Sequence, residues 1–108
     1  MPAPTDHRLA QARSLALHAE VAARLRSDPA ILRMAQRRVR GWRQDGSVHA
    51  EYVAAWQALL GRGARHVAEA LETDSERMRD LRQVSPFAGV LAPRERWTIW
   101  RAASASAP

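Results

Sequence analysis

Apolar residues recur every three or four positions along most of the chain, which is the spacing of amphipathic α-helices. Alternating runs of β-branched residues are missing, while the abundant Ala, Leu, Arg and Glu favour helix. The pattern predicts helices over about 6–26, 29–45, 49–61, 64–72, 74–83 and 93–103. We therefore expect an all-α fold, a compact bundle of five to six short helices forming a single domain over 1–108, with 1–4 and 103–108 frayed.

The first predicted helix is apolar on two sides. One stripe consists of Leu9, Ala12, Leu15, Ala16, Ala19 and Ala23, and the other of Ala10, Leu17, Val21 and Leu25. A helix that is apolar on two sides is buried on two sides. This helix therefore either lies in the middle of the bundle or offers one side to another chain, such as a second copy in a homodimer. Leu17, Val21 and Leu25 are the candidate second apolar face.

Three helix boundaries carry specific signals. Asp28 followed by Pro29 is typical of an N-cap and first turn, because proline lacks only an N–H that the helix does not use there. Gly46 ends the same helix at a position that favours left-handed backbone. Thr73 and Glu76 have the spacing of a capping box and predict the start of the fifth helix.

The second predicted helix has a basic face opposite its core face. The core face consists of Leu32, Ala35, Val39 and Trp42, and the basic face of Arg33, Arg37, Arg40 and Gln44. All 17 basic residues of the chain are arginine, and residues 1–46 hold most of the net charge, 9 − 4 = +5, against 8 − 7 = +1 for 47–108. The basic face is therefore either a solvated surface or a binding surface for phosphates or an acidic protein patch.

Signals for enzyme chemistry are weak. Cysteine is absent, and His7, His18, His49 and His66 show no metal-binding spacing and are expected to be solvated. No glycine-rich phosphate loop and no nucleophile–base–orienter set is recognisable. We expect no enzyme, no catalytic residues, no metal and no cofactor. The N-terminus lacks the apolar core of a signal peptide, and no long apolar run is present, so we expect a cytoplasmic protein without membrane contact.

Residues 66–81, HVAEALETDSERMRDL, resemble a helix-turn-helix. Ala68 falls where the first helix of such a motif needs a small residue, and Met78 falls where the second helix needs an apolar residue. However, the turn position expected to be glycine is Glu72, and the candidate recognition helix starts with acidic residues at the end that would approach DNA. DNA reading by this unit is an alternative to a plain helical hairpin.

The stretch LRQVSPFAGVLAPRERWTIW, residues 81–100, contains more large apolar residues than we expect in a loop and one short helix. Ser85 to Ala92 is expected to be a packed Ω-like loop with a bend at Gly89, followed by a helix on which Trp97 and Trp100 share one face. Arg96 falls within that face, so it must extend to solvent, stack on a ring or pair with an acid.

This stretch permits two interpretations. Either both tryptophans belong to the core and Arg96 covers them, or they are interface residues, because Trp and Arg are enriched at binding hot spots. On the second interpretation, the candidate partner-binding residues are Arg33, Arg37, Arg40, Phe87, Val90, Leu91, Arg94, Arg96, Trp97, Trp100 and Arg101.

Residues 81–101, together with the helices that carry Trp42 and Trp56, resemble a group of small all-helical bacterial antitoxins that are encoded beside toxin genes, including partners of nucleotidyltransferase-like toxins. The resemblance covers most of residues 8–101 and contains no catalytic motif. It implies an antitoxin that binds its cognate toxin protein and neutralises it by direct occlusion. Some antitoxins also bind their own operator DNA, and the imperfect helix-turn-helix leaves that role open here.

Overall fold

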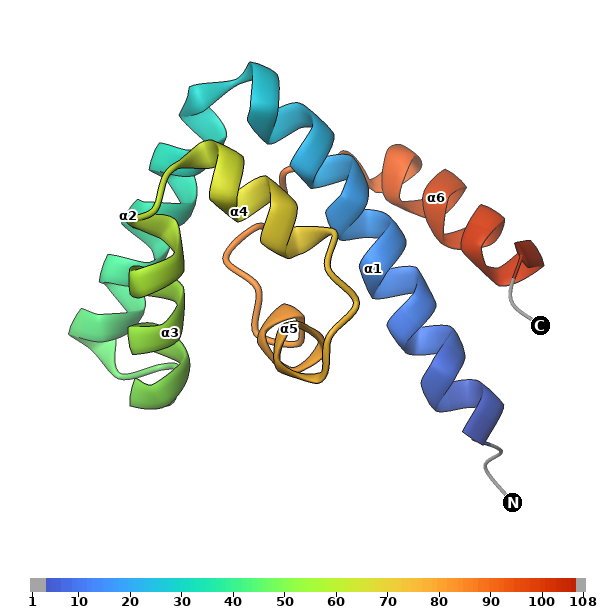
Figure 1. Ribbon diagram of the computed structural model, residues 1–108, viewed down its shortest axis with the longest axis horizontal. Coiled ribbons are helices and arrows are strands. Elements are labelled where there is room, and N and C mark those ends of the chain that lie inside the picture. The colour runs from blue at the N-terminus through green and yellow to red at the C-terminus, as the bar shows by residue number, and fades with distance from the viewer. Residues whose placement is uncertain (1–3, 107–108) are drawn as a thin grey trace.

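The computed structural model describes residues 4–106 and contains six helices and no strand in that range (Figure 1). The helices are α1 (Pro4–Ser27), α2 (Pro29–Asp45), α3 (Ala50–Leu60), α4 (Ala64–Leu71), α5 (Glu76–Arg82) and α6 (Pro93–Ser106). The predicted all-α bundle of five to six helices is confirmed. Residues 1–3 and 107–108, which were expected to fray, lie outside the described residues, whereas 103–106 continue α6.

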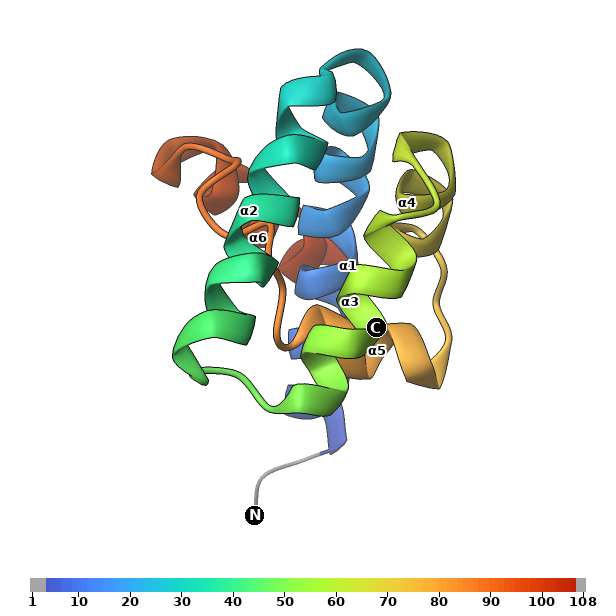
Figure 2. The same cartoon turned by 90° about the vertical axis from the view of Figure 1, so that its left-hand side faces the viewer.

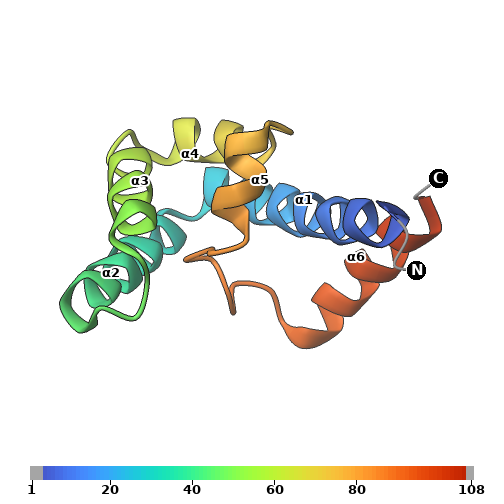
Figure 3. The same ribbon diagram turned by 90° about the horizontal axis from the view of Figure 1, so that it is seen from below.

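Helix α1 is the central element and contacts α2, α4, α5 and α6. Seen from below, α4 and α5 lie along one side of α1 and α6 along the other (Figure 3). Other helices of the same chain thus pack against α1 on both sides, although Ala10 and Ala23 remain exposed. Val21 and Leu25 are buried in the core and Leu17 packs against it, so the expectation that these residues form a spare face for another chain is wrong.

The core lies where α1, α2, α3 and α4 meet the segment 83–92. Helices α2 and α3 pack as an antiparallel hairpin (Figure 2), and Trp56 of α3 is fully buried beneath them. Its ring meets the buried ring of Phe87 edge to face, with 6.0 Å between centroids. Phe87 and Leu91 bring the segment 83–92 into the core, which explains its apolar composition.

Most boundary signals act as expected, with one exception. The Asp28 side chain accepts from the Ala30 N–H, and Gly46 takes φ +70°, as predicted. The capping box at Thr73 is wrong, because Ser75 is the N-cap of α5 and its Oγ accepts from the Met78 N–H. The Thr73 hydroxyl instead donates to a carbonyl of α4.

The connection between α4 and α5 encloses a buried arginine. Arg82 is 4% exposed, and its Nη1 donates to the carbonyl oxygens of Leu71 (3.3 Å) and Thr73 (2.8 Å). These carbonyls lie at the C-terminal end of α4, where backbone acceptors lack helical partners. Arg82 therefore holds α5 against the end of α4, at the steep angle seen in Figure 1.

Candidate functional site

Helix α6 packs chiefly against α1 and is fastened to it at both ends. Near its start, Arg24 of α1 forms an ion pair with Glu95, whose Oε1 also accepts from the Ala92 N–H at 3.0 Å. Near its end, the Arg13 guanidinium lies 3.3 Å from the ring centroid of Trp100, and its Nε donates to the Ser104 hydroxyl. These contacts fix which face of α6 turns outward.

The outward face is unusual in carrying exposed aromatic surface. We define the α6 surface as Arg94, Arg96, Trp97, Trp100 and Arg101. Trp97 is 56% exposed, the one large hydrophobic side chain of the described residues that is exposed, and it stacks on half-buried Trp100 with 5.0 Å between ring centroids. The Arg101 guanidinium lies 6.0 Å from the Trp97 ring. The interpretation that both tryptophans belong to the core therefore does not apply to Trp97.

The positive charge of the α6 surface is not neutralised by the described chain. Glu95 is the one acid of α6, and its carboxylate is bound by Arg24, which holds the pKa of Glu95 below its usual value. Within residues 4–106, the Arg96 guanidinium has no ion pair and no hydrogen bond, and Arg94 and Arg101 have no ion pair. Arg96 thus takes the first of its expected alternatives and extends to solvent.

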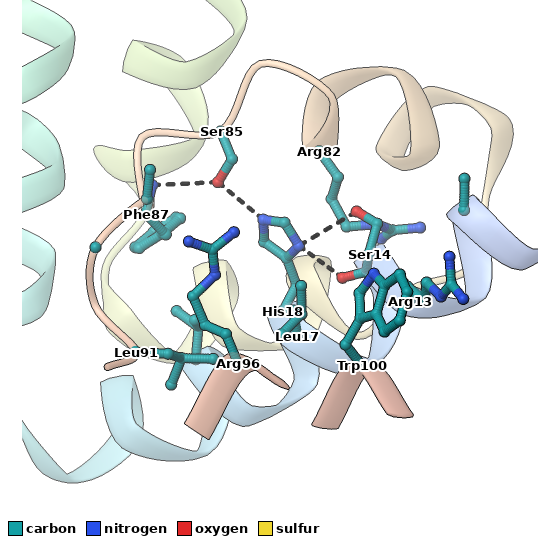
Figure 4. Close-up of a pocket in the computed structure, with 14 residues that line it drawn as sticks. Arg13, Ser14, Leu17, His18, Arg82, Ser85, Phe87, Leu91, Arg96 and Trp100 are labelled. Carbon is teal, nitrogen blue, oxygen red and sulfur yellow. Dashed lines mark hydrogen bonds between the residues drawn. The ribbon is translucent and has the colours of Figure 1, made fainter. Parts of the chain in front are cut away.

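A cavity of about 380 Å³ lies behind this surface, between α1, the segment 83–92 and α6 (Figure 4). Its walls are largely apolar, from Leu17, Val21, Phe87, Leu91 and Trp100. Its polar side chains are Arg13, Ser14, His18, Arg82, Ser85 and Arg96. A second, shallower hollow on the other side of Arg96 is formed with Leu17, Pro93, Trp97 and Trp100.

His18 lies at the centre of a complete hydrogen-bond chain in this cavity (Figure 4). Its Nδ1 lies 2.7 Å from the Ser14 carbonyl oxygen, which can only accept, so Nδ1 carries a proton and, in the neutral ring, Nε2 is an acceptor. The Ser85 hydroxyl therefore donates to Nε2 at 2.8 Å, and it accepts from the Phe87 N–H. Burial lowers the pKa of His18, which favours this neutral form.

The expectation that His18 is solvated is wrong, since its side chain is 8% exposed. Ser85 is 67 residues away in sequence, so no local motif joins the two. The one available signal was position, because His18 follows Leu17 and precedes Val21 on the apolar side of α1. Arg82 was missed for a related reason: the capping of α4 by a distant guanidinium leaves no spacing pattern.

The structure separates the candidate partner-binding residues into three groups. Arg33, Arg37 and Arg40 are exposed on α2, at the opposite end of the molecule from α6 (Figures 1 and 3). Phe87 and Leu91 are buried and Val90 is half-buried, so these loop residues serve the core and the cavity wall and do not form an outer surface. Arg94, Arg96, Trp97, Trp100 and Arg101 are brought together as the α6 surface.

The helix-turn-helix-like unit offers an acidic outer face. The exposed acidic residues at or on α5 are Asp74, Glu76 and Asp80, and the basic residues beside them are Arg77 and Arg79. The net charge of this group is 2 − 3 = −1. Arg79 is moreover paired with Asp74 at 2.7 Å. This face repels phosphates, and the third arginine of the helix, Arg82, is buried.

No family model matches the chain, and comparisons with curated proteins and with solved structures gave no match. Across residues 4–106, no helix combines the length and apolarity needed to cross a membrane. The same residues contain no group of three or more His, Asp or Glu placed to hold a metal ion.

Proposed function

We propose that this chain is a protein-binding module, an antitoxin that neutralises a cognate bacterial toxin by direct occlusion and performs no chemistry of its own. The observation that carries the proposal is the exposure of Trp97 within an unneutralised arginine surface. An exposed tryptophan lowers the solubility of a protein, and Trp and Arg are among the residue types that contribute most to binding at protein interfaces.

The α6 surface supplies both parts of a docking site. Trp97 and Trp100 form a stacked, rigid apolar anchor that enters a hollow of the partner. Arg94, Arg96 and Arg101 surround it and pair with carboxylates, since guanidinium groups bind carboxylates bidentately. The partner surface is therefore acidic around an apolar hollow, the character of a toxin cleft that holds a metal or a nucleotide.

The exposed face of α2 has a separate place in this proposal. Arg33, Arg37 and Arg40 belong to α2, which lies at the other end of the molecule from α6 (Figure 3), so they do not surround the same anchor. They contribute a second, electrostatic contact only if the toxin is large enough to reach both ends of a molecule whose longest dimension is 39 Å. Long-range attraction by this face would raise the association rate more than the affinity.

The test is co-expression with the product of the neighbouring gene, followed by affinity capture and a growth-rescue assay. The wild-type chain is expected to form a stable complex and to restore growth. Trp97→Ala is expected to weaken the complex by about 30-fold, since a hot-spot tryptophan contributes about 2 kcal/mol or more. Arg62→Gln serves as the control, because it removes an exposed arginine that belongs neither to the α6 surface nor to the basic face of α2.

Two results would contradict the proposal. A chain that forms no complex and gives no rescue is not an antitoxin for that toxin. A complex that Trp97→Ala leaves intact but Arg37→Gln disrupts would place the interface on α2 and remove the role of the α6 surface.

The alternative function is a DNA-binding regulator. The exposed Arg33, Arg37 and Arg40 favour it, because none of them forms an ion pair in the described part of the chain. The acidic outer face of α5 counts against operator reading by residues 66–81. This alternative predicts duplex binding that weakens steeply with salt, with a slope that flattens by about one unit for Arg33→Ala. Unchanged mobility of operator DNA at low salt would exclude it.

A further inference from the structure

The cavity beneath α6 has an unbalanced set of charges. Three arginines and one histidine line it, and no carboxylate of the described residues does. The residues described around the shallower hollow beyond Arg96 also include no carboxylate. Arginines that line a structural cavity are normally paired, because an isolated charge in a low-dielectric setting is costly. These hollows therefore have a positive potential that the described chain leaves uncompensated.

Arg82 adds a buried part to this field. Its side chain is 1% exposed, and its Nε and Nη2 have no hydrogen-bond partner among the described residues. The nearest carboxylate oxygen, on Asp74, is 4.0 Å from Nη2 and belongs to a side chain that is 58% exposed and already pairs with Arg79. Arg82 is itself one of the residues that line the cavity, and its charge adds to the lowering of the pKa of His18 by burial.

Arg96 supplies the flexible contact at the mouth. It is exposed, its guanidinium has no partner within residues 4–106, and it borders both hollows together with Leu17 and Trp100. Arg13 differs, because it is held by Trp100 and Ser104 and contributes charge at a fixed place. The Arg96 guanidinium is therefore free to contact a ligand, while Arg13 and Arg82 contribute positive charge at fixed places behind it.

The remaining walls favour an apolar body. Leu17, Val21, Phe87, Leu91 and Trp100 line the cavity, and a volume of about 380 Å³ is in the range of small-molecule pockets. The polar groups of His18 and Ser85 already satisfy each other, so they do not demand a polar ligand atom. A small inorganic anion would leave these apolar walls uncovered.

From the unpaired guanidinium of Arg96, the further positive charges of Arg13 and Arg82 and the apolar walls, we propose that this cavity binds a small amphipathic carboxylate, with the carboxylate on Arg96 and a ring or branched chain between Leu17, Phe87 and Leu91. The site binds without catalysis. It does not depend on the proposed antitoxin function, and its test uses no partner protein.

The probe is phenylacetate, added to the full-length chain and followed by backbone amide and indole NMR shifts. Phenylacetate is expected to bind saturably and to shift the signals of Ser85, Phe87, Gly89 and the Trp100 indole. Phenylacetamide has the same shape without the charge, and acetate has the charge without the ring. Phenylacetamide is expected to bind about tenfold more weakly or worse, since a hydrogen bond to a charged group contributes about that much. Acetate is expected to bind about as weakly, since it buries no ring against the apolar walls.

Two variants locate the site. Arg96→Gln is expected to weaken phenylacetate binding about tenfold, because it removes the free charge at the mouth. Arg94→Gln, an exposed arginine of the same helix that lines neither hollow, is the matched control and is expected to leave the affinity unchanged. Ala10→Phe narrows the cavity from an exposed position and is expected to reduce binding without altering the core.

The proposal is overturned if phenylacetamide binds as well as phenylacetate, or if Arg96→Gln retains full affinity. It is also overturned if the shifts spread equally over Arg33 and Arg37 on α2, which would mean general adsorption of anions to an arginine-rich surface. A phenylacetate shift confined to cavity residues and lost with Arg96→Gln supports it, whatever the result with the toxin.

Discussion

Two tryptophans of this chain show how differently its two ends use the same residue type. Trp56 is fully buried where α2 and α3 meet the segment 83–92, and Phe87 packs edge-on against its ring. Trp97 is 56% exposed on α6, and its neighbours are a parallel ring and an arginine. The body of the molecule covers its own aromatic surface, whereas α6 presents it.

The difference follows from how many elements reach each region. Trp56 belongs to a core to which helices α1 to α5 and the segment 83–92 all contribute buried residues, so its large side chain is fully covered. Helix α6 packs chiefly on one face of α1, and a helix held on one side can bury only one stripe. Aromatic residues beyond that stripe remain available to another molecule.

Among the substitutions that test this contrast, Trp56→Ala is expected to lower the free energy of unfolding most. Removing a fully buried aromatic side chain leaves a cavity that a packed core cannot close, at a cost of about 3–5 kcal/mol. Urea unfolding followed by circular dichroism measures it. Trp56→Phe is the control and is expected to cost less, because the buried Nε1 of Trp56 has no hydrogen-bond partner among the described residues. A loss under about 1 kcal/mol for Trp56→Ala would show that the core is not tightly packed there.

Protonation of His18 at low pH is expected to lower the free energy of unfolding by a smaller amount. Burial keeps the pKa of His18 below its ordinary 6.5, so the unfolded chain binds a proton more readily than the folded chain between the two values. Stability is then fully present above about pH 6.5 and decreases as the pH falls through the lowered pKa of the folded state. Urea unfolding at pH 7.5 and 5.5 measures this decrease.

Two variants separate the titration of His18 from its hydrogen bonds. His18→Gln is expected to lose about 1–3 kcal/mol at neutral pH and to be less sensitive to acid over the same interval. Ser85→Ala removes the hydrogen bond to Nε2 but keeps the titrating ring, so it remains sensitive to acid. Equal acid sensitivity in His18→Gln and the wild type would assign the decrease to other groups.

The sequence predicted local features well and long-range ones poorly. Helix positions, the Asp28 cap and the Gly46 turn depend on neighbours within a few residues, and all three are confirmed. The buried roles of His18 and Arg82 depend on partners in other elements, and neither was anticipated. A polar residue gives no sign in its local pattern of whether a distant element will cover it.

The candidate site was predicted in part for the same reason. Helical spacing placed Trp97 and Trp100 on one face and Arg96 inside it, and the structure brings these residues together on α6. Spacing could not decide whether another helix would cover that face, nor that Phe87 and Leu91 would turn inward. Apolar residues in a loop look alike in sequence whether they serve a core or an interface.

Weakening the attachment of α6 to α1 is expected to lower the stability of the whole molecule still less. It tests whether α6 and the body around Trp56 are held independently. Glu95→Gln keeps the shape of the side chain but removes its charge, so the ion pair with Arg24 is lost. Amide exchange in α6 should become faster, while exchange around Trp56 should stay the same. Because the pairing lowers the pKa of Glu95, its contribution is present above about pH 4.5 and is lost as the pH falls further.

The control for this change is Arg65→Ala, which breaks the pair Arg65–Glu69 on α4, whose side chains are 89% and 58% exposed. It is expected to leave amide exchange in α6 unchanged, since exposed pairs contribute little. If exchange became faster to the same extent throughout the chain in Glu95→Gln, α6 would unfold together with the body and would not be a separately held element.

The smallest effect on stability is expected from Trp97→Ala, and its smallness is what makes it informative. An exposed side chain on a helix held from the other side should change the free energy of unfolding by no more than about 0.5 kcal/mol. The matched substitution Trp56→Ala is expected to cost several times more, although both remove one indole from one helix. If Trp97→Ala destabilised the chain as strongly, Trp97 would be a core residue and the α6 surface would lose its anchor. A variant that folds normally and no longer binds a partner would instead show that α6 keeps this ring exposed for recognition, at no benefit to the fold itself.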